Sequence, residues 1–106
     1  MNLLDIFKRK DINEGVKRYR ETEGAVLLDV RTRSEYAHGH IEGSRNLPLD
    51  ELDRASAYVS NKSTPVFVHC LSGGRSARAA AYLRDCGYST VHDIGGIGDY
   101  TGRIVS

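Results

Sequence analysis

Phe67-Val68-His69-Cys70-Leu71-Ser72-Gly73-Gly74-Arg75-Ser76 begins as an apolar run, stops on a cysteine and continues through a glycine-bearing turn into a helical pattern. A strand that ends at Cys70 and a helix that starts near Ser76 force the backbone between them into a tight turn, whose N–H groups converge on one point. Such donors, with a helix dipole behind them, favour a thiolate and an incoming anion. Arg75 adds a permanent cation whose planar fork fits oxyanions. The stretch therefore predicts a cysteine nucleophile in an anion-binding turn.

Apolar runs alternate with helical patterns on both sides of this turn. Residues 25–30 form a nearly unbroken apolar run, as expected for a strand buried on both faces. Residues 66–69 predict the next strand, and residues 90–94 predict a last short one, before a final helical turn over residues 97–100. The alternation predicts an α/β fold in three layers, with a central parallel sheet flanked by helices.

Polar residues predict where the helices begin. Asp11 opens a helix over residues 11–20, and Ser34 caps a single turn over residues 35–37. Asp50 is expected to cap a further helix, whose inward residues are Leu52, Ala55 and Val59. The helix after the cysteine turn is expected to pack small and apolar residues on the sheet, namely Ala77, Ala80, Ala81 and Leu83.

Length and charge bound the function. With 106 residues the chain is expected to be one domain, 1–106, in which residues 1–10 form an N-terminal extension or a short helix. The net charge is +1, from 15 basic and 14 acidic residues, so no broad field favours nucleic acid or an anionic membrane. No apolar run approaches the roughly 20 residues of a membrane span. The first residues also lack the order of a secretory signal, so a cytoplasmic location is expected.

Cys70 and Cys86 are the only cysteines, and neither belongs to a C-x-x-C pair. Thioredoxin-like redox cycling and a cysteine zinc cluster are therefore not predicted. A helix between the two would hold them about 15 Å apart, whereas a disulfide needs Cα atoms within about 7 Å. Cys86 is expected to be a small apolar filler near a helix end. His38 and His40 form an H-x-H pair without a third ligand at fitting spacing, so no metal site is predicted.

Other chemistry-bearing residues also follow predicted strands. Asp29 and Arg31 follow the first buried strand, and Gly95-Gly96 follows the last, so these segments and Cys70 are expected at one rim of the sheet. A carboxylate beside a thiolate would raise the pKa of the thiol, so Asp29 and Arg31 are interpreted as an ion pair or a brace for a loop rather than as catalytic residues. His69 precedes Cys70 in a strand and is expected to point away from the sulfur.

Five segments of the chain, in this order, resemble those of the single-domain rhodanese family. They are Leu27-Leu28-Asp29-Val30-Arg31, Glu35-Tyr36-Ala37-His38-Gly39-His40-Ile41-Glu42-Gly43-Ser44, Asn46-Leu47-Pro48-Leu49, His69-Cys70-Leu71-Ser72-Gly73-Gly74-Arg75-Ser76 and Gly95-Gly96-Ile97. The resemblance implies sulfurtransfer through a persulfide on Cys70. It also implies an active-site loop made of Leu71, Ser72, Gly73, Gly74, Arg75 and Ser76, in which Arg75 contacts the anionic end of the donor. Glu35 and His40 would belong to a loop that holds the shape of the site from beneath.

The resemblance further implies a thiosulfate or protein-persulfide donor and an acceptor such as cyanide, a thiol or another protein. Neither a metal nor a cofactor is expected. Two alternatives remain open. One is a persulfide carrier or interaction module that turns over free thiosulfate poorly. The other is a phosphatase or arsenate reductase of the rhodanese type, which is disfavoured because those proteins space cysteine and arginine as C-x5-R, whereas Cys70 and Arg75 are C-x4-R.

Overall fold

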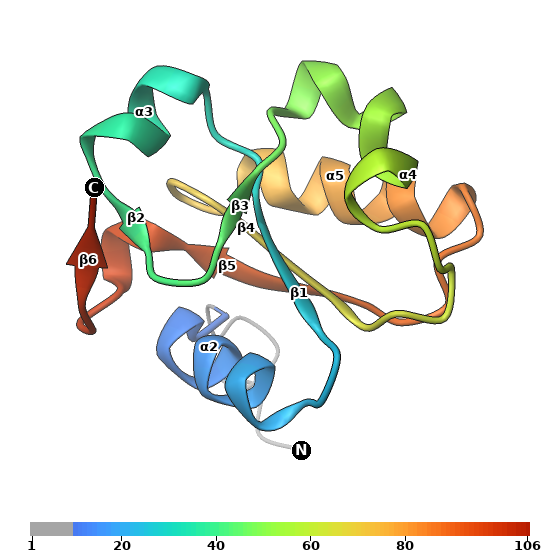
Figure 1. Cartoon of the computed structure of the whole chain (residues 1–106). Coiled ribbons are helices and arrows are strands. Elements are labelled where there is room, and N and C mark those ends of the chain that lie inside the picture. Colours follow the sequence, from blue (N-terminus) through green and yellow to red (C-terminus); the bar gives the residue numbers. More distant parts are fainter. Residues whose placement is uncertain (1–9) are drawn as a thin grey trace, which may run out of the picture.

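A four-stranded parallel sheet forms the centre of the molecule (Figure 1). The computed structural model describes residues 10–106, so the extension expected over residues 1–10 lies outside the described residues except for Lys10. The strand order is β3-β1-β4-β5, and the strands are β1 (Val26–Asp29), β3 (Arg45–Asn46), β4 (Val66–Cys70) and β5 (Val91–Gly96). Each neighbouring pair is parallel. The predicted α/β fold with a central parallel sheet is confirmed.

Helices cover both faces of the sheet. Helix α2 (Ile12–Glu21) covers one face, below the sheet in Figure 1. The opposite face carries the 3-10 helix η1 (Leu49–Arg54), α4 (Ala55–Tyr58) and α5 (Gly74–Asp85). Each face has its own apolar core: Leu27 and Phe67 pack toward α2, whereas Leu28 and Val68 pack toward α5. This division explains the unbroken apolar runs, since successive strand residues point to opposite faces and both faces are buried.

Helix α2 begins where the sequence predicted, whereas the next helix begins two residues earlier than predicted. Asp11 caps α2 by accepting a hydrogen bond of 3.0 Å from the backbone N–H of Asn13. Helix α3 (Arg33–His38) is capped by Thr32, so the prediction for Ser34 was wrong. Thr32 stands three residues before Glu35, and the two exchange side-chain and backbone hydrogen bonds in a capping box.

The segment after Pro48 departs further from the prediction. Asp50 does not cap a helix, because the chain turns into η1 already at Leu49, and Asp50 lies inside that helix. Proline fixes φ near the value that a helix start needs, which lets the turn begin directly behind it. The predicted inward residues are nevertheless buried, namely Leu52, Ala55 and Val59.

Helix α5 begins at Gly74, two residues earlier than predicted. Its buried face consists of Ser76, Ala79, Ala80 and Leu83, while Ala77 and Ala81 are exposed. The prediction failed for these two alanines because small residues occur all around this helix and do not define which side faces the sheet.

A second, smaller sheet lies at the C-terminal end. Strand β2 (His40–Ile41) pairs antiparallel with β6 (Ile104–Val105). The short helix η2 (Ile97–Asp99) precedes β6 in the chain and lies where the sequence predicted a helical turn. Within residues 10–106, no helix is both long and apolar enough to cross a bilayer.

Candidate active site

Cys70 is the last residue of β4 and only 1% exposed. The chain leaves the sheet through Leu71 and Ser72 and reaches Gly73, whose φ of 105° is left-handed and favours glycine. This conformation turns the backbone N–H of Gly73 toward Cys70, 3.0 Å from Sγ. Helix α5 starts at the next residue. The predicted strand, turn and helix are therefore present, and we call residues 71–76 the Cys70 loop.

Opposing influences act on the Cys70 thiol. Burial raises its pKa, but hydrogen bonds from the Ser76 side chain and from the backbone N–H groups of Ser76, Gly73 and Ser72 lower it, and the net pKa lies below that of an ordinary thiol. The Ser76 side chain is fully buried, and its Oγ lies 3.5 Å from Sγ. A lowered pKa increases the thiolate fraction at neutral pH, and the thiolate is the nucleophilic form.

Arg75 does not point freely into solvent. Its guanidinium makes a bidentate ion pair with Glu35 of α3, with Nη1–Oε1 and Nη2–Oε2 distances of 2.6 and 3.0 Å. The hydrogen bond from Arg75 is the largest influence on Glu35 and lowers the pKa of that carboxyl to about 2. The side chains are 31% and 29% exposed. This pair ties the Cys70 loop to α3, a contact between residues forty positions apart.

Asp29 and Arg31 form the ion pair that the sequence predicted. Arg31 Nη2 lies 2.7 Å from Asp29 Oδ2, and Arg31 Nε lies 3.0 Å from both carboxylate oxygens. Arg31 Nη2 also donates to the carbonyl oxygen of Gly39 at 2.8 Å, which fixes the end of α3. Both residues are buried, so this brace is closed to solvent.

His69 lies against this brace. Its Nε2 is 3.8 Å from Asp29 Oδ2 and makes no hydrogen bond, while its Nδ1 faces the carbonyl oxygen of Cys70 at 3.5 Å. Burial lowers the pKa of His69 more than the Asp29 charge raises it. The ring nitrogens thus face groups other than the Cys70 sulfur, as expected from strand geometry.

His40 packs within the segment that carries Glu35. Its ring stacks on Tyr36 at a centroid distance of 3.7 Å, and its Nδ1 lies 2.8 Å from the Tyr36 carbonyl oxygen. His38 Nδ1 instead meets the carbonyl oxygen of Ser34. Among residues 10–106 no group of three or more histidine, cysteine or acidic side chains is placed to hold a metal ion.

The end of β5 and the start of η2 pack against the Cys70 loop. Gly98 N–H donates to the Leu71 carbonyl oxygen at 3.1 Å. A Cβ atom on Gly96 would overlap that same oxygen, so the absence of a side chain lets the strand pass beneath the loop. The side chain of Leu71 points outward and is 48% exposed. The Gly95-Gly96 segment and Cys70 therefore share one rim, as the sequence predicted.

Sequence reasoning missed Asp93. This residue of β5 accepts a hydrogen bond of 2.8 Å from Ser76 Oγ and one of 3.1 Å from Gly95 N–H. The strand carries a bulge here, since Val68 pairs with Asp93 but His69 pairs with Gly95. An acidic residue two positions before Gly95-Gly96, next to His92 in a short strand, was the available signal. Cys86 lies at the end of α5 and forms no disulfide, as predicted, but it is exposed, so its interpretation as an apolar filler was wrong.

Comparison with known proteins places this geometry in a family context. A family model for the rhodanese-like domain matches residues 13–102. The chain is 37% identical over 81 residues to the uncharacterized protein YqhL of Bacillus subtilis, covering 76% of this chain and 64% of YqhL. The match therefore spans slightly less than two thirds of that relative.

Two further relatives come from Escherichia coli. The thiosulfate sulfurtransferase PspE is 36% identical over 73 residues, which cover 68% of this chain and 70% of PspE. A solved rhodanese with anions superposes with a TM-score of 0.72 at 33% identity, covering 76% of this chain and 96% of that structure.

Proposed function

Because the chain belongs to the rhodanese-like domain family, we propose that it is a sulfurtransferase in which Cys70 carries the transferred sulfur. The observation that carries the proposal is the placement of Sγ at the carboxyl end of β4, 3.0 Å from the backbone N–H of Gly73. A sulfur atom in this position meets fixed donors, and the N-terminus of α5 lies directly behind the turn. Both favour a negative charge on the sulfur or on an atom bound to it.

In the proposed first half-reaction, the Cys70 thiolate attacks the outer sulfur of thiosulfate. A bond forms between Sγ and that sulfur, the S–S bond of thiosulfate breaks, and sulfite leaves with the bonding electron pair. The product is a persulfide on Cys70. In the second half-reaction a nucleophile such as cyanide attacks the outer sulfur, and the Cys70 thiolate returns as the leaving group. The thiosulfate:cyanide type of activity is thus the assay that we propose for this chain.

Arg75 is proposed to receive the sulfonate end of the donor. Its guanidinium already holds a carboxylate in bidentate geometry, which matches two oxygens of a sulfonate equally well. Donor and Glu35 would therefore compete for the same fork. The remaining loop residues, Leu71, Ser72 and Gly74, are exposed and are proposed to border the donor, while Ser76 is proposed to act from beneath.

Asp29, Arg31, Glu35 and His40 are proposed to support the site without touching the transferred sulfur. Their hydrogen bonds run to one another, to the Cys70 loop and to the α3 segment. We propose a small anionic sulfur donor or a protein persulfide as partner, a thiol or protein as acceptor, and neither nucleic acid nor membrane. No cofactor takes part in the proposed cycle.

Mass spectrometry of the intact protein after incubation with thiosulfate tests the proposal. We expect a gain of one sulfur atom that disappears on adding cyanide, with formation of thiocyanate, and that is absent in Cys70→Ser. Cys86→Ser is the matched control and should load normally, since Cys86 is exposed and lies beyond the end of α5. Loading of Cys86 instead of Cys70 would contradict the proposal.

The same experiment separates the alternatives. Loading by a protein persulfide but not by thiosulfate would assign the chain as a carrier. Hydrolysis of a phosphate ester without any sulfur adduct would assign it as a phosphatase.

A further inference from the structure

The hydroxyl of Ser76 has more acceptors around it than protons to give. Its Oγ lies 2.8 Å from Asp93 Oδ1, 3.1 Å from the carbonyl oxygen of Gly73 and 3.5 Å from Cys70 Sγ. A serine hydroxyl carries one proton and two lone pairs. Only one of these three neighbours can accept the hydroxyl hydrogen bond at a time. The hydrogen bonding of the other two therefore depends on which one accepts it.

Asp93 is the strongest competitor for this proton. Its distance to Ser76 Oγ is the shortest of the three, and a hydrogen bond to an ionised carboxylate is roughly twice as strong as one between neutral groups. When the Ser76 hydroxyl donates its hydrogen bond to Asp93, the lone pairs of Ser76 Oγ face the sulfur. The Ser76 oxygen then accepts a hydrogen bond from the Cys70 thiol, which keeps the sulfur protonated. When Ser76 no longer donates to Asp93, its hydroxyl can donate a hydrogen bond to the sulfur, and the thiol proton leaves to solvent.

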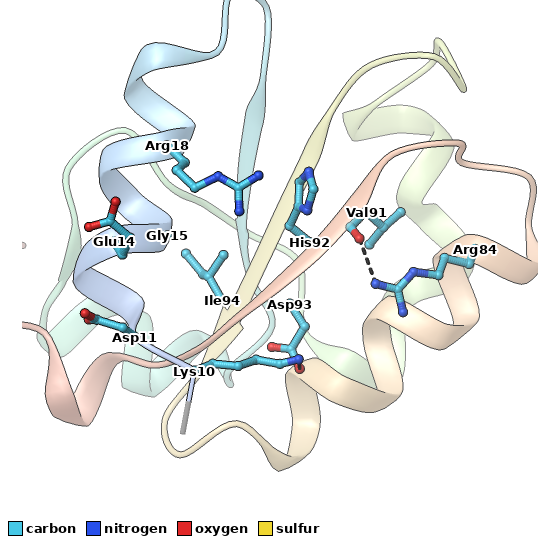
Figure 2. Close-up of a pocket in the computed structure, with 10 residues that line it drawn as sticks. All are labelled: Lys10, Asp11, Glu14, Gly15, Arg18, Arg84, Val91, His92, Asp93 and Ile94. Atoms are coloured by element: carbon cyan, nitrogen blue, oxygen red, sulfur yellow. Dashed lines mark hydrogen bonds and ion pairs between the residues drawn. The ribbon is translucent and has the colours of Figure 1, made fainter. Parts of the chain in front are cut away.

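The carboxylate of Asp93 is held in place independently of the loop. Its side chain is 8% exposed, Oδ1 also accepts the Gly95 N–H, and Oδ2 lies 3.7 Å from Lys10 Nζ. Figure 2 shows Lys10 reaching toward Asp93 from the start of α2. Lys10, Asp93, Ser72 and Gly73 also line a cavity of about 230 Å³ beside the loop. Asp93 therefore borders this cavity and also contacts Ser76.

Other charged and titratable groups lie around Cys70 and Asp93. Arg75 is attracted by the charge of Cys70 and is already neutralised by Glu35. The groups from the remaining elements are Asp29 at the end of β1, Arg31 after it, His69 on β4, Arg84 on α5, His92 on β5, and Asp99 on η2. Within this set, Asp93 is the carboxylate joined to Cys70 through one hydroxyl.

We propose that Asp93 is a positioning residue that, by competing for the proton of Ser76, controls whether Cys70 rests as thiol or thiolate. Asp93 reduces the stabilisation of the thiolate by the Ser76 hydroxyl. The backbone N–H groups of Ser72, Gly73 and Ser76 stabilise the thiolate independently of Asp93. The inference rests on the proposed role of Cys70 as nucleophile. It adds a residue of β5, outside the Cys70 loop, to the groups that set the reactivity of the sulfur.

The test is a pH titration of the ultraviolet absorbance of the Cys70 thiolate in a Cys86→Ser background, where Cys70 is the sole thiol. Asp93→Asn removes the carboxylate charge and retains an acceptor for Gly95 N–H. We expect the midpoint of the thiol titration to lie at lower pH in Asp93→Asn than in the parent. At one pH unit below the parent midpoint, the thiolate fraction of the variant should be several-fold and up to about tenfold larger than that of the parent. Asp85→Asn removes the same charge from the exposed end of α5 and should leave the titration unchanged.

Two further variants show whether Ser76 carries the effect. In a Ser76→Ala background, Asp93→Asn should change the thiolate fraction by about twofold or less. Lys10→Met keeps Asp93 and removes its cation, so the midpoint should rise; Lys10 is 58% exposed, so this variant is expected to fold. Coincident titrations of Asp93→Asn and its parent, or an undiminished effect without Ser76, would overturn the inference. Failure of thiosulfate loading with the shift intact would instead count against the proposed function alone.

Discussion

Two arginine–carboxylate pairs stand at the same rim of the sheet and differ in sequence separation and in burial. Asp29 and Arg31 are two residues apart and buried, and Arg31 also donates a hydrogen bond to the Gly39 carbonyl oxygen. Glu35 and Arg75 come from α3 and α5, lie forty residues apart and keep about a third of each side chain in solvent. The chemistry of the contacts is the same, whereas the exposure to water is not.

Exposure decides how easily each pair opens. Removing one partner of a buried pair leaves an uncompensated charge and typically costs about 3–5 kcal/mol. An exposed pair is typically worth about 0–1 kcal/mol, because water replaces the lost partner. The Asp29–Arg31 pair is therefore a permanent brace. The Glu35–Arg75 pair is expected to open at a much smaller cost in free energy.

The largest expected effect is on stability. Asp29→Asn should lower the free energy of unfolding by about 3–5 kcal/mol, because Arg31 keeps its charge in a buried site. Glu35→Gln should lower it by about 1 kcal/mol or less. Urea denaturation of both variants beside the parent measures the difference. Similar losses for the two would mean that burial does not distinguish the pairs.

Arg75→Ala should show its effect on donors rather than on folding. Loss of a charge-assisted contact of about 1.5–3 kcal/mol predicts a decrease of about 10- to 100-fold in kcat/KM for an anionic sulfur donor. A neutral donor should be affected much less. Arg78→Ala is the matched control, since Arg78 lies one turn along α5 and is exposed. Equal losses for anionic and neutral donors would remove Arg75 from the proposed anion contact.

Acid should weaken the two regions in separate pH windows. Burial lowers the pKa of His69, so its neutral form is favoured in the folded chain, and stability should fall as pH drops below the ordinary value of 6.5. The slope for this one group is at most about 1.4 kcal/mol per pH unit. The depressed pKa of Glu35 adds a contribution that is present above 4.5 and is lost toward about 2.

Chemical denaturation at several pH values measures these slopes. His69→Gln should flatten the upper window, and Glu35→Gln should flatten the lower one. A parent chain whose stability rises between pH 6.5 and 5 would contradict the assignment to His69.

Salt provides the smallest and most selective probe. At 1 M ionic strength the screening length is about 3 Å, which weakens exposed charge pairs and leaves buried ones nearly intact. The stability difference between the parent and Glu35→Gln should shrink by a few tenths of a kcal/mol, while the loss caused by Asp29→Asn persists. Loss of both differences in high salt would show that the brace around Arg31 is open to solvent.

The sequence predicted those parts of the molecule that depend on local pattern. The buried strands, the turn after Cys70 and the Asp29–Arg31 pair all follow from short stretches whose residue types leave few choices. The starts of α3 and η1 were misplaced, because Thr32 and Ser34 both offer capping hydroxyls, and Pro48 begins the turn before Asp50 can cap it. In these cases the competing signals lie within a few residues of each other.

Contacts between distant elements were beyond the sequence. Nothing in the spacing of Glu35 and Arg75 predicts that they meet, because their pairing depends on how α3 is placed over the sheet. Asp93 was missed for a similar reason: a bulge in β5 accompanies its approach to Ser76, and bulges leave little trace in a single sequence.

The glycine at position 96 has a consequence for engineering this scaffold. Because Gly96 has no side chain, the Leu71 carbonyl oxygen can approach its Cα closely, and the residue at position 96 therefore limits how near the Cys70 loop comes to β5. Gly96→Ala would lift the loop backbone without altering any residue within it. A graded series of small side chains at this position would then offer a way to move the backbone of Leu71 and Ser72 relative to the Cys70 sulfur.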